Sequence, residues 1–428
     1  MRSGLIDLAP AGLEVIERRL NAPDRGPVAV ALSGGGDSLA LLHVAHAWAL
    51  RAGRPLVALT VDHGLQAKSA DWCAFAADRA AALGLTHRTL VWTGEKPATG
   101  LPAAARAARH RLIANEVGAL GARVVLMGHT ADDVLEGVEM RRLGCNVPIP
   151  AVWSPSPAWP EGRGVFLLRP LLGARRSELR ALLTALGERW IDDPANEDPR
   201  FTRAAARRRL SESAHSAPPG CDPPPVAGVD QVFEGAGGEL AAPRHLFVGP
   251  QARRLLGAMV LCAAGGDRPP RRDSLDRLLA RLTTGEAFTA GLAGARIEVA
   301  DDAVSCFREV GERTRGGLAE TPLPVGESVF DGRFAVTAAE PGWRVAALRG
   351  ATKRLPAAER RRLSALPASV RGALPVAISL AGDHSCPIVA HSAAVVARPL
   401  GLQRLRAALG ALADEAALWR VAKPPMGA

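Results

Sequence analysis

The stretch PVAVALSGGGDS at residues 27–38 decides the fold, because it joins an apolar run directly to a glycine-rich turn. Residues 27–32 are typical of a short buried strand, and residues 39–50 have the spacing of a helix. The same alternation repeats to about residue 190. Further strands are expected at 56–61, 86–92, 123–127 and 165–168, and further helices at 70–83, 102–120 and 132–143. This order predicts an α/β fold with a doubly wound parallel sheet, whose functional residues lie at the carboxyl ends of the strands.

The rest of the chain indicates two further parts. A proline-rich stretch at 146–164 is expected to form a loop outside the sheet, and another at 216–229 is the clearest linker in the chain. Beyond the linker, a helical pattern precedes a region of short, strand-like runs. We therefore expect a first domain at 1–215, a linker and helical central domain at 216–286, and a small α+β domain at 287–428.

The composition favours a nucleic-acid partner. The 428 residues include 53 Lys and Arg against 43 Asp and Glu, a net charge of +10, which attracts polyanions. No apolar run reaches the ~18–20 residues that cross a bilayer, so no membrane partner is expected and the cytoplasm is the default location. None of the six cysteines lies in a CxxC pair, which argues against a zinc knuckle or an iron–sulfur cradle.

The glycine-rich turn predicts a site for the phosphates of ATP. Consecutive glycines let backbone N–H groups surround an anion, and the following helix N-terminus adds partial positive charge. The turn lacks the Gly-Lys-Ser/Thr of a Walker A loop, so no lysine offsets the repulsion between the Asp37 carboxylate and the phosphates. Mg²⁺ is expected to bind between them and offset it. The simpler interpretation is a turn with an Asp or Ser helix cap. The predicted ATP-binding residues of the loop are Ser33, Gly34, Gly35, Gly36, Asp37 and Ser38.

The segment GHTADDVLE at 128–136 follows the fourth expected strand and is rich in acids. Asp132 or Asp133 can simply cap the next helix. However, the spacing of His129, Asp133 and Glu136 lets these side chains converge at the strand end. There they could hold Mg²⁺, orient a nucleophile or accept a proton, and Asp37, Asp133 and Glu136 are the predicted metal ligands.

Two pairs of polar residues add to this edge. Asp62 and His63 end the second expected strand, where the base or ribose of a nucleotide would lie, although a plain turn is the alternative. Arg106 and Arg109 lie one helical turn apart and could clamp the α-phosphate or pyrophosphate. A solvated helix face is the alternative for this pair.

An arginine-rich segment near the end of the first domain predicts a phosphate-backbone contact with RNA. Five arginines fall within ten residues, and a solvated helix face is again the alternative. They are Arg200, Arg203, Arg207, Arg208 and Arg209, of which the last four are the predicted tRNA-binding residues.

Together these motifs resemble the tRNA(Ile)-lysidine synthetase family of the N-type ATP pyrophosphatases, the PP-loop superfamily. The matching elements are LSGGGDS at 32–38, VDHGL at 61–65, the AARxxRH helix at 104–110, GHTADDxLE at 128–136, the Arg169–Leu172 run and WIDDPAN at 190–196. Weaker likenesses to the family's C-terminal portion occur at 308–309 and 331–334. The arginine-rich segment lacks the Asn of the family's Arg-Asn-x-x-Arg run.

The resemblance implies a two-step reaction on the wobble cytidine in the anticodon loop of an isoleucine tRNA. The C2 oxygen of the base attacks the α-phosphate of ATP and releases pyrophosphate, and the ε-amine of free L-lysine then displaces AMP. It implies ATP and Mg²⁺ as cofactors. The chain beyond the linker adds basic charge and no visible catalytic residues, so residues 287–428 are expected to contact the tRNA; a homodimer is possible. The catalytic residues would be Asp37, Arg109, His129, Asp133 and Glu136.

Two alternatives share parts of this pattern. A PP-loop tRNA thiolase would use the same ATP chemistry, but many such enzymes carry paired cysteines, which are absent here. A non-catalytic RNA-binding relative would be expected to lose Asp37, Asp133 or Glu136, and all three are present.

Overall fold

The computed structural model describes residues 10–21, 26–145, 147–192, 202–211, 222–311, 318–390 and 394–422. Contacts divide the chain into two compact units. The first contains the residues up to 223 together with those from 412 onward, and the second contains 224–411. The C-terminal segment therefore packs with the N-terminal unit, while the domain boundaries expected at 215 and 286 stay predictions.

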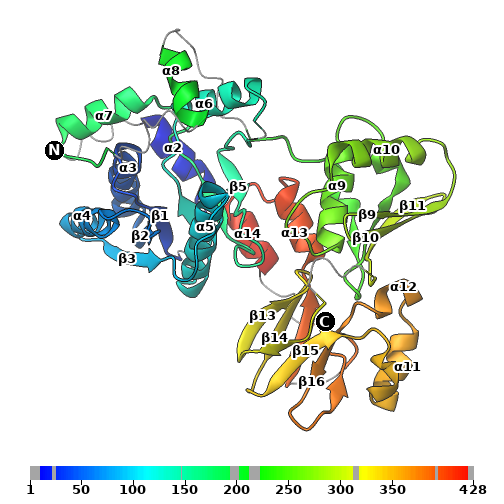
Figure 1. The fold of residues 1–428 in the computed structure, drawn as a ribbon. Helices are drawn as coiled ribbons and strands as arrows, with labels where there is room; N and C mark the ends of the chain where they lie inside the picture. Colours follow the sequence, from blue (N-terminus) through cyan, green and yellow to red (C-terminus); the bar gives the residue numbers. More distant parts are fainter. Residues whose placement is uncertain are drawn as a thin grey trace. The chain divides into compact units, whose positions relative to one another are not determined.

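The first unit is built on a six-stranded sheet covered by helices (Figure 1). All neighbouring strands are parallel except for the last pair, and this confirms the predicted α/β fold with a parallel sheet. In spatial order the strands are β3 (Thr86–Val91), β2 (Leu56–Asp62), β1 (Val28–Ala31), β4 (Val124–Leu126), β6 (Phe166–Leu168) and β5 (Trp153–Pro155). The helices are α2 (Pro10–Arg19), α3 (Gly36–Ala52), α4 (Ser69–Ala82), α5 (Leu101–Ala119), α6 (Ala131–Arg142), α7 (Arg176–Ala185), α8 (Thr202–Ser211) and α14 (Glu415–Ala422).

The strand order places a switch point between β1 and β4. The chain runs outward from β1 to β2 and β3, then returns to β4 on the other side. In such a sheet the crevice at the carboxyl ends of the two central strands is the usual ligand site. The turn at 33–38 and the segment at 128–136 leave the sheet at these two strand ends, so the fold brings the two main motifs together.

The expectation of a loop at 146–164 was wrong for the residues of β5. Trp153–Pro155 pairs antiparallel with β6 and forms an edge of the sheet. A proline is tolerated there because the outer side of an edge strand needs no N–H donor. The buried Trp153 ring stacks on Phe166 with 4.9 Å between ring centroids, which anchors the strand.

The turn between β1 and α3 needs glycine for steric reasons. Gly34 has φ +81°, and a Cβ there would lie 2.6 Å from Cδ1 of Ile191. Ile191 also donates its backbone N–H to the Gly34 carbonyl at 2.9 Å. A Cβ on Gly128, after β4, would lie 3.0 Å from the carbonyl oxygen of Asp37. The two motifs therefore touch through backbone at positions where side chains do not fit.

The second unit contains antiparallel sheets and helices. One sheet has the order β7 (Phe233–Glu234), β8 (Leu240–Pro243), β11 (Ala303–Arg308), β10 (Ala295–Val299) and β9 (Phe288–Leu292). It shares a core with α9 (Ala252–Ala263), α10 (Arg272–Leu282) and α13 (Gly401–Ala408). The expected boundary at 286 thus falls between α10 and β9, which contribute to one core.

A second core in this unit lies between two smaller sheets. Their orders are β12 (Thr321–Leu323), β15 (Trp343–Ala347), β16 (Pro375–Ile378), β17 (His384–Ser385), and β13 (Gly326–Phe330), β14 (Phe334–Ala338), β18 (Val395–Pro399). The remaining helices are α11 (Ala357–Ser364), α12 (Ala368–Arg371) and the 3₁₀ turns η2 (Val229–Gln231), η3 (Arg244–Phe247) and η4 (Ala351–Arg354). Among the described helices of both units, none is long and apolar enough to cross a membrane.

A buried ion pair attaches α14 to the first unit. Arg54 donates to both carboxylate oxygens of Glu415 at 2.9 Å and to the carbonyl of Gly26. The two side chains are only 3% and 1% exposed. Removing one partner would leave the other charge buried without compensation.

We expect Glu415→Ala to lower the free energy of unfolding of the first unit by ~3–5 kcal/mol, the usual cost of breaking a buried pair. Arg51→Ala is the control, because Arg51 forms an exposed pair with Glu17 and should cost less than ~1 kcal/mol. Urea denaturation followed by tryptophan fluorescence measures both. Equal, small effects would mean that α14 does not depend on this pair.

Gly34→Ala should destabilise the first unit by ~1–3 kcal/mol, since alanine is strained at φ +81° and collides with Ile191. Gly35→Ala is a matched control one residue away: its φ is −71° and a Cβ would meet nothing closer than 3.6 Å. It should change stability by less than ~0.5 kcal/mol. Thermal melting of the two variants decides, and similar losses in both would contradict the steric explanation.

Candidate active site

Hydroxyl groups shape the glycine-rich turn. Ser33 Oγ and Ser38 Oγ lie 3.1 Å apart, and Ser38 Oγ donates to the carbonyl of Gly35 at 2.9 Å. Helix α3 begins at Gly36 without a side-chain cap. The simpler interpretation, in which Asp37 or Ser38 caps this helix, therefore does not account for the turn. An uncapped helix N-terminus behind a glycine turn suits an anion such as phosphate.

The acids of α6 are buried at the end of β4. Asp133 Oδ2 accepts hydrogen bonds from the backbone N–H and the hydroxyl of Thr130, at 2.9 and 3.1 Å, so Asp133 is the N3 residue of a capping box whose N-cap is Thr130. It is 8% exposed, and Glu136, one turn further along, is 1% exposed. Two carboxylates this deeply buried require nearby positive charge.

Arg176, the first residue of α7, supplies that charge. Its Nε donates to Asp37 Oδ2 at 3.0 Å, its Nη1 lies 3.3 Å from Glu136 Oε1 and its Nη2 lies 3.8 Å from Asp133 Oδ1. The backbone N–H of Arg176 donates to Asp132 Oδ2 at 2.7 Å, which fixes the start of α7. One guanidinium thus joins the acids of the α3 and α6 motifs.

A second arginine reaches the same acids from α8. Arg207 Nε donates to Glu136 Oε1 at 2.6 Å. Burial raises the pKa of Asp37, and Arg176 opposes this shift by attraction and by its hydrogen bond. Burial alone would lower the pKa of Arg176, but Asp37, Glu136 and Asp133 raise it, so the guanidinium stays charged.

The predicted metal ligands all lie within this ion-pair network. Asp37, Asp133 and Glu136 offer hard oxygen donors, which suit Mg²⁺. Arg176, however, contacts each of them. Throughout the described part of the chain, no three His, Cys, Asp or Glu residues are grouped so that they could hold a metal ion. As arranged here, the three acids are held in ion pairs and do not fit a resident metal.

The residues after β2 lie at the neighbouring part of the sheet edge. Asp62 Oδ1 accepts the N–H of Gly64 at 2.8 Å and the Ser69 hydroxyl, and these bonds lower its pKa. Asp62 therefore stabilises the turn into α4. Arg109 of α5 donates to His63 Nε2 at 3.4 Å, and burial together with Arg109 lowers the pKa of His63. These contacts bring His63 and Arg109 together as a neutral imidazole beside a cation.

The AARxxRH helix carries a further histidine in a basic environment. Burial, followed by Arg106, Arg109, Arg169 and His129, lowers the pKa of His110 to about 3. Arg106 and Arg109 are exposed, whereas His129 is half-buried beside the acid helix. The structure therefore gathers Arg106, Arg109 and His129 around a neutral His110, which concentrates positive charge near this edge.

The arginine-rich segment divides in the structure. Arg207 points at Glu136, Arg209 Nη1 lies 3.4 Å from Glu139 Oε1, and Arg208 is exposed. The side chain of Arg203 and all of Arg200 lie outside the described residues. Arg207 is thus part of the acid network, a contact that the charge run alone did not predict.

Arg176 is the residue that the sequence did not single out. It lies 139 residues from Asp37, and nothing in its local pattern distinguishes it from Arg175 or Arg180. The available signal was indirect: several expected acids at one sheet edge require a buried cation. Trp190 belongs to the WIDDPAN motif, and its ring packs 3.5 Å from where a Cβ on Gly36 would lie, against the phosphate turn.

Comparison with known proteins places these features in a family. The PP-loop domain matches residues 13–214. The tRNA(Ile)-lysidine synthase of Caulobacter vibrioides is 48% identical over 413 residues, covering 94% of this chain and 97% of that protein. The tRNA(Ile)-lysidine synthase of Hyphomonas neptunium is 37% identical, covering 75% of this chain and 92% of that protein.

Among solved structures, the U34-tRNA thiolase NcsA from Methanococcus maripaludis is 19% identical with a TM-score of 0.41, covering 48% of this chain and 73% of that chain. The similarity to the Caulobacter vibrioides enzyme covers 94% of this chain and therefore extends into both units. It agrees with the motif order found in the first unit. The chain belongs to the tRNA(Ile)-lysidine synthase family, with a PP-loop domain at its N-terminal end.

Proposed function

We propose that this protein adenylates the wobble cytidine of an isoleucine tRNA with ATP and then joins free lysine to it, forming lysidine. The observation that carries the proposal is the Arg176 bridge between Asp37 of the phosphate turn and Glu136 of the acid helix. It holds a candidate phosphate site and candidate proton acceptors within one network. The names of the relatives support the substrate.

In the proposed first step, the turn at 33–38 holds the phosphates of ATP. Backbone N–H groups and the hydroxyls of Ser33 and Ser38 would bind the pyrophosphate portion as it leaves. Arg109, exposed on α5, would attract the negative charge that develops at the α-phosphate. A wobble base lies in a single-stranded loop, so little unpairing is needed to present it.

In the proposed second step, the ε-ammonium group of lysine must lose one proton before it attacks C2 of the activated base and a second proton as AMP leaves. Asp133 and Glu136 are acceptors for such a proton, and half-buried His129 lies at the same strand end. Mg²⁺ as the companion of ATP stays a prediction, as do the cytoplasmic location and a homodimer.

The thiolase alternative lacks support from the cysteines. In the described residues all five cysteines are free, and three of them are buried in the second unit. Burial raises the pKa of the Cys73 thiol, which disfavours the reactive thiolate. The alternative of a non-catalytic RNA-binding relative is disfavoured because Asp37, Asp133 and Glu136 converge in one ion-pair network.

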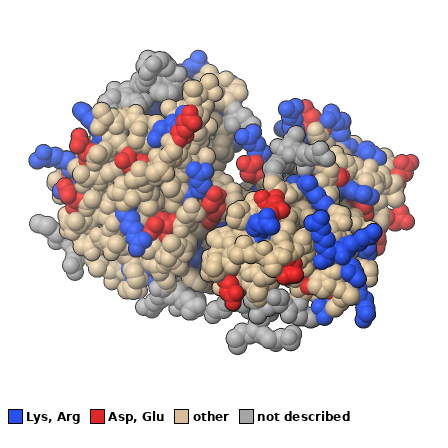
Figure 2. Space-filling model, turned by 60° about the horizontal axis from the view of Figure 1, so that its bottom comes forward, with Lys and Arg blue, Asp and Glu red and all other residues tan. Residues whose placement is uncertain are grey.

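We also propose that the second unit binds the tRNA backbone through a basic surface. Figure 2 shows Lys and Arg gathered on this unit. Lys353, Arg354, Arg360, Arg361 and Arg362 lie in or beside η4 and α11 and are all exposed. The one acid within α11, Glu359, is buried and accepts hydrogen bonds from Ser385 and Cys386. The solvent-exposed face of this helix therefore carries its arginines and not its carboxylate.

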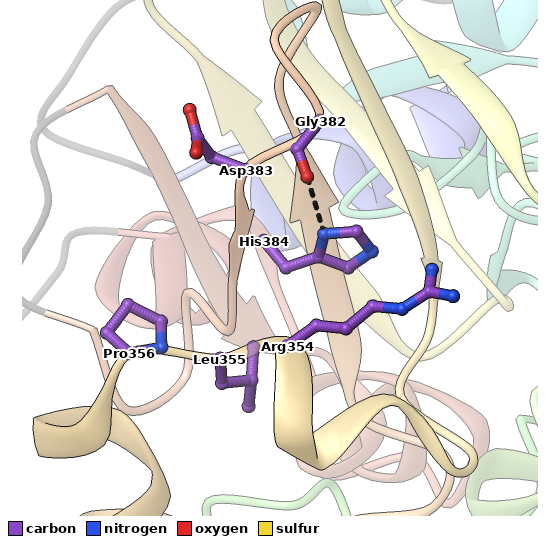
Figure 3. Close-up of a pocket in the computed structure, with 6 residues that line it drawn as sticks. All are labelled: Arg354, Leu355, Pro356, Gly382, Asp383 and His384. Atoms are coloured by element: carbon purple, nitrogen blue, oxygen red, sulfur yellow. Dashed lines mark hydrogen bonds between the residues drawn. The ribbon is translucent and has the colours of Figure 1, made fainter.

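A pocket adjoins this basic surface (Figure 3). Arg354, Leu355 and Pro356 line one side of it, and Gly382, Asp383 and His384 line the other. The Arg354 side chain extends beside the His384 ring, whose Nδ1 lies 2.8 Å from the carbonyl of Gly382. A guanidinium beside an imidazole suits a phosphate of the RNA chain.

The protein should convert α-labelled ATP to AMP and pyrophosphate when it is given lysine and an isoleucine tRNA with cytidine at the wobble position. Mass spectrometry of the tRNA nucleosides should show lysine added to that cytidine. Asp37→Asn should lower the rate at least ~10²-fold with the fold retained. ADP as the product, or sulfur in place of lysine, would refute the proposed reaction.

Replacing Arg360, Arg361 and Arg362 by Gln should weaken tRNA binding and make its salt dependence shallower by ~0.7–0.9 for each lost phosphate contact. A matched control replaces Arg253, Arg296 and Arg344, which are paired with Asp276, Glu298 and Glu320. Filter binding at several salt concentrations measures both triple variants. An equal loss in the control would show that only net charge matters and that α11 is not a specific contact.

A further inference from the structure

We propose that Arg176 occupies the metal position of this site in the nucleotide-free protein and keeps divalent cations out until ATP arrives. This inference rests on the proposed use of ATP. It adds that Arg176 is the counter-ion of the three acids when no nucleotide is bound. Three carboxylates of suitable chemistry converge here, yet they are not arranged as a metal site.

The geometry of Arg176 is that of a central cation. Its three guanidinium nitrogens each face a different acid, at 3.0 Å for Asp37, 3.3 Å for Glu136 and 3.8 Å for Asp133. Glu136 is nearly inaccessible to solvent, so water cannot stabilise the negative charge of its carboxylate in place of the guanidinium. Replacing this guanidinium by a neutral group would leave like charges close together, a situation that favours uptake of a cation.

The charge balance explains why a metal would be excluded. Arg176 and Arg207 together bring two positive charges to the three carboxylates. A divalent cation entering among them would meet both guanidiniums at close range and would be repelled. The triphosphate of ATP would add several negative charges beside Asp37. There would then be enough anionic oxygens to bind both a divalent cation and the guanidinium of Arg176.

Arg176 is anchored at its backbone, and its side chain is partly exposed. Its backbone is fixed by the hydrogen bond to Asp132, whereas its long side chain is 23% exposed. Because its Nε already contacts the first turn of α3, a phosphate bound at the glycine turn would lie within reach of the same guanidinium. Exchange of a carboxylate for a phosphate partner needs only rotation of the side chain.

The test measures metal binding without nucleotide, tRNA or lysine. Mn²⁺ serves as the probe, since it takes the same oxygen ligands as Mg²⁺ and its free concentration is read by electron paramagnetic resonance. Nucleotide-free wild-type protein should bind Mn²⁺ weakly, whereas Arg176→Gln should bind it at least ~10-fold more tightly. Mn²⁺ should also raise the melting midpoint of Arg176→Gln and leave that of the wild type unchanged.

Arg175→Gln is the matched control, because Arg175 directly precedes Arg176 and its guanidinium pairs with Asp132 at 2.9 Å. It should bind Mn²⁺ as weakly as the wild type, and so should Arg176→Lys, which keeps one positive charge. Equal Mn²⁺ affinity in wild type and Arg176→Gln overturns the proposal. If Arg176→Gln does not fold, the wild-type protein and Arg176→Lys still test the proposal. Tight Mn²⁺ binding by the nucleotide-free wild type that Asp37→Asn abolishes would overturn it. Weak Mn²⁺ binding by both the wild type and Arg176→Lys would support it.

Failure of this test is separate from failure of the proposed reaction. A protein that makes lysidine but binds Mn²⁺ tightly without nucleotide would refute only the role of Arg176. A protein that behaves as expected toward Mn²⁺ but forms no AMP would refute only the reaction.

Discussion

The contact of one guanidinium with three carboxylates is the interaction on which the first unit depends. Arg176 connects the helix that follows β1, the helix that follows β4 and the start of α7. Without it, buried Glu136 and half-buried Asp37 would repel each other at the switch point of the sheet. The parallel sheet brings the acids together because its central strands end at one edge, and the arginine makes that arrangement stable. The same charges are the groups that we propose for catalysis, so stability and chemistry share one cluster.

Backbone proximity is the second constraint. The turn at Gly34 and the segment at Gly128 approach so closely that side chains are excluded, and Ile191 closes the turn from the other side. A phosphate held at this turn would therefore lie against fixed N–H groups. Such fixed donors need no rearrangement when negative charge develops on the phosphate. The fixed N–H groups of the turn and the charged Arg176 side chain thus have complementary roles in the proposed reaction.

Local patterns predicted the parts of the structure that depend on local physics. The apolar runs and the glycine turn predicted the parallel sheet. The spacing of Asp133 and Glu136 predicted that their side chains converge. The edge strand at Trp153 was missed because prolines dominate its neighbourhood, while its pairing depends on distant Phe166. Arg176 and the Arg54–Glu415 pair were missed because their partners are far apart in the sequence. The family likeness at 308–309 and 331–334 did not predict that Arg308, Asp331 and Arg333 form a buried ion-pair cluster within the second unit.

Helix α14 lies at the C-terminal end of the chain but belongs to the first unit. A chain that ends before residue 412 would leave Arg54 buried without Glu415, so point variants separate the functions of the units better than truncation does.

The central claim is that the cytidine itself attacks the α-phosphate and that lysine then displaces AMP. An isoleucine tRNA with ¹⁸O at C2 of its wobble cytidine tests this directly, because that oxygen must leave with the phosphate. Mass spectrometry of the released AMP should find one ¹⁸O atom per molecule, with lysidine formed in equal amount. Unlabelled AMP, with the ¹⁸O retained in the tRNA, would contradict the account.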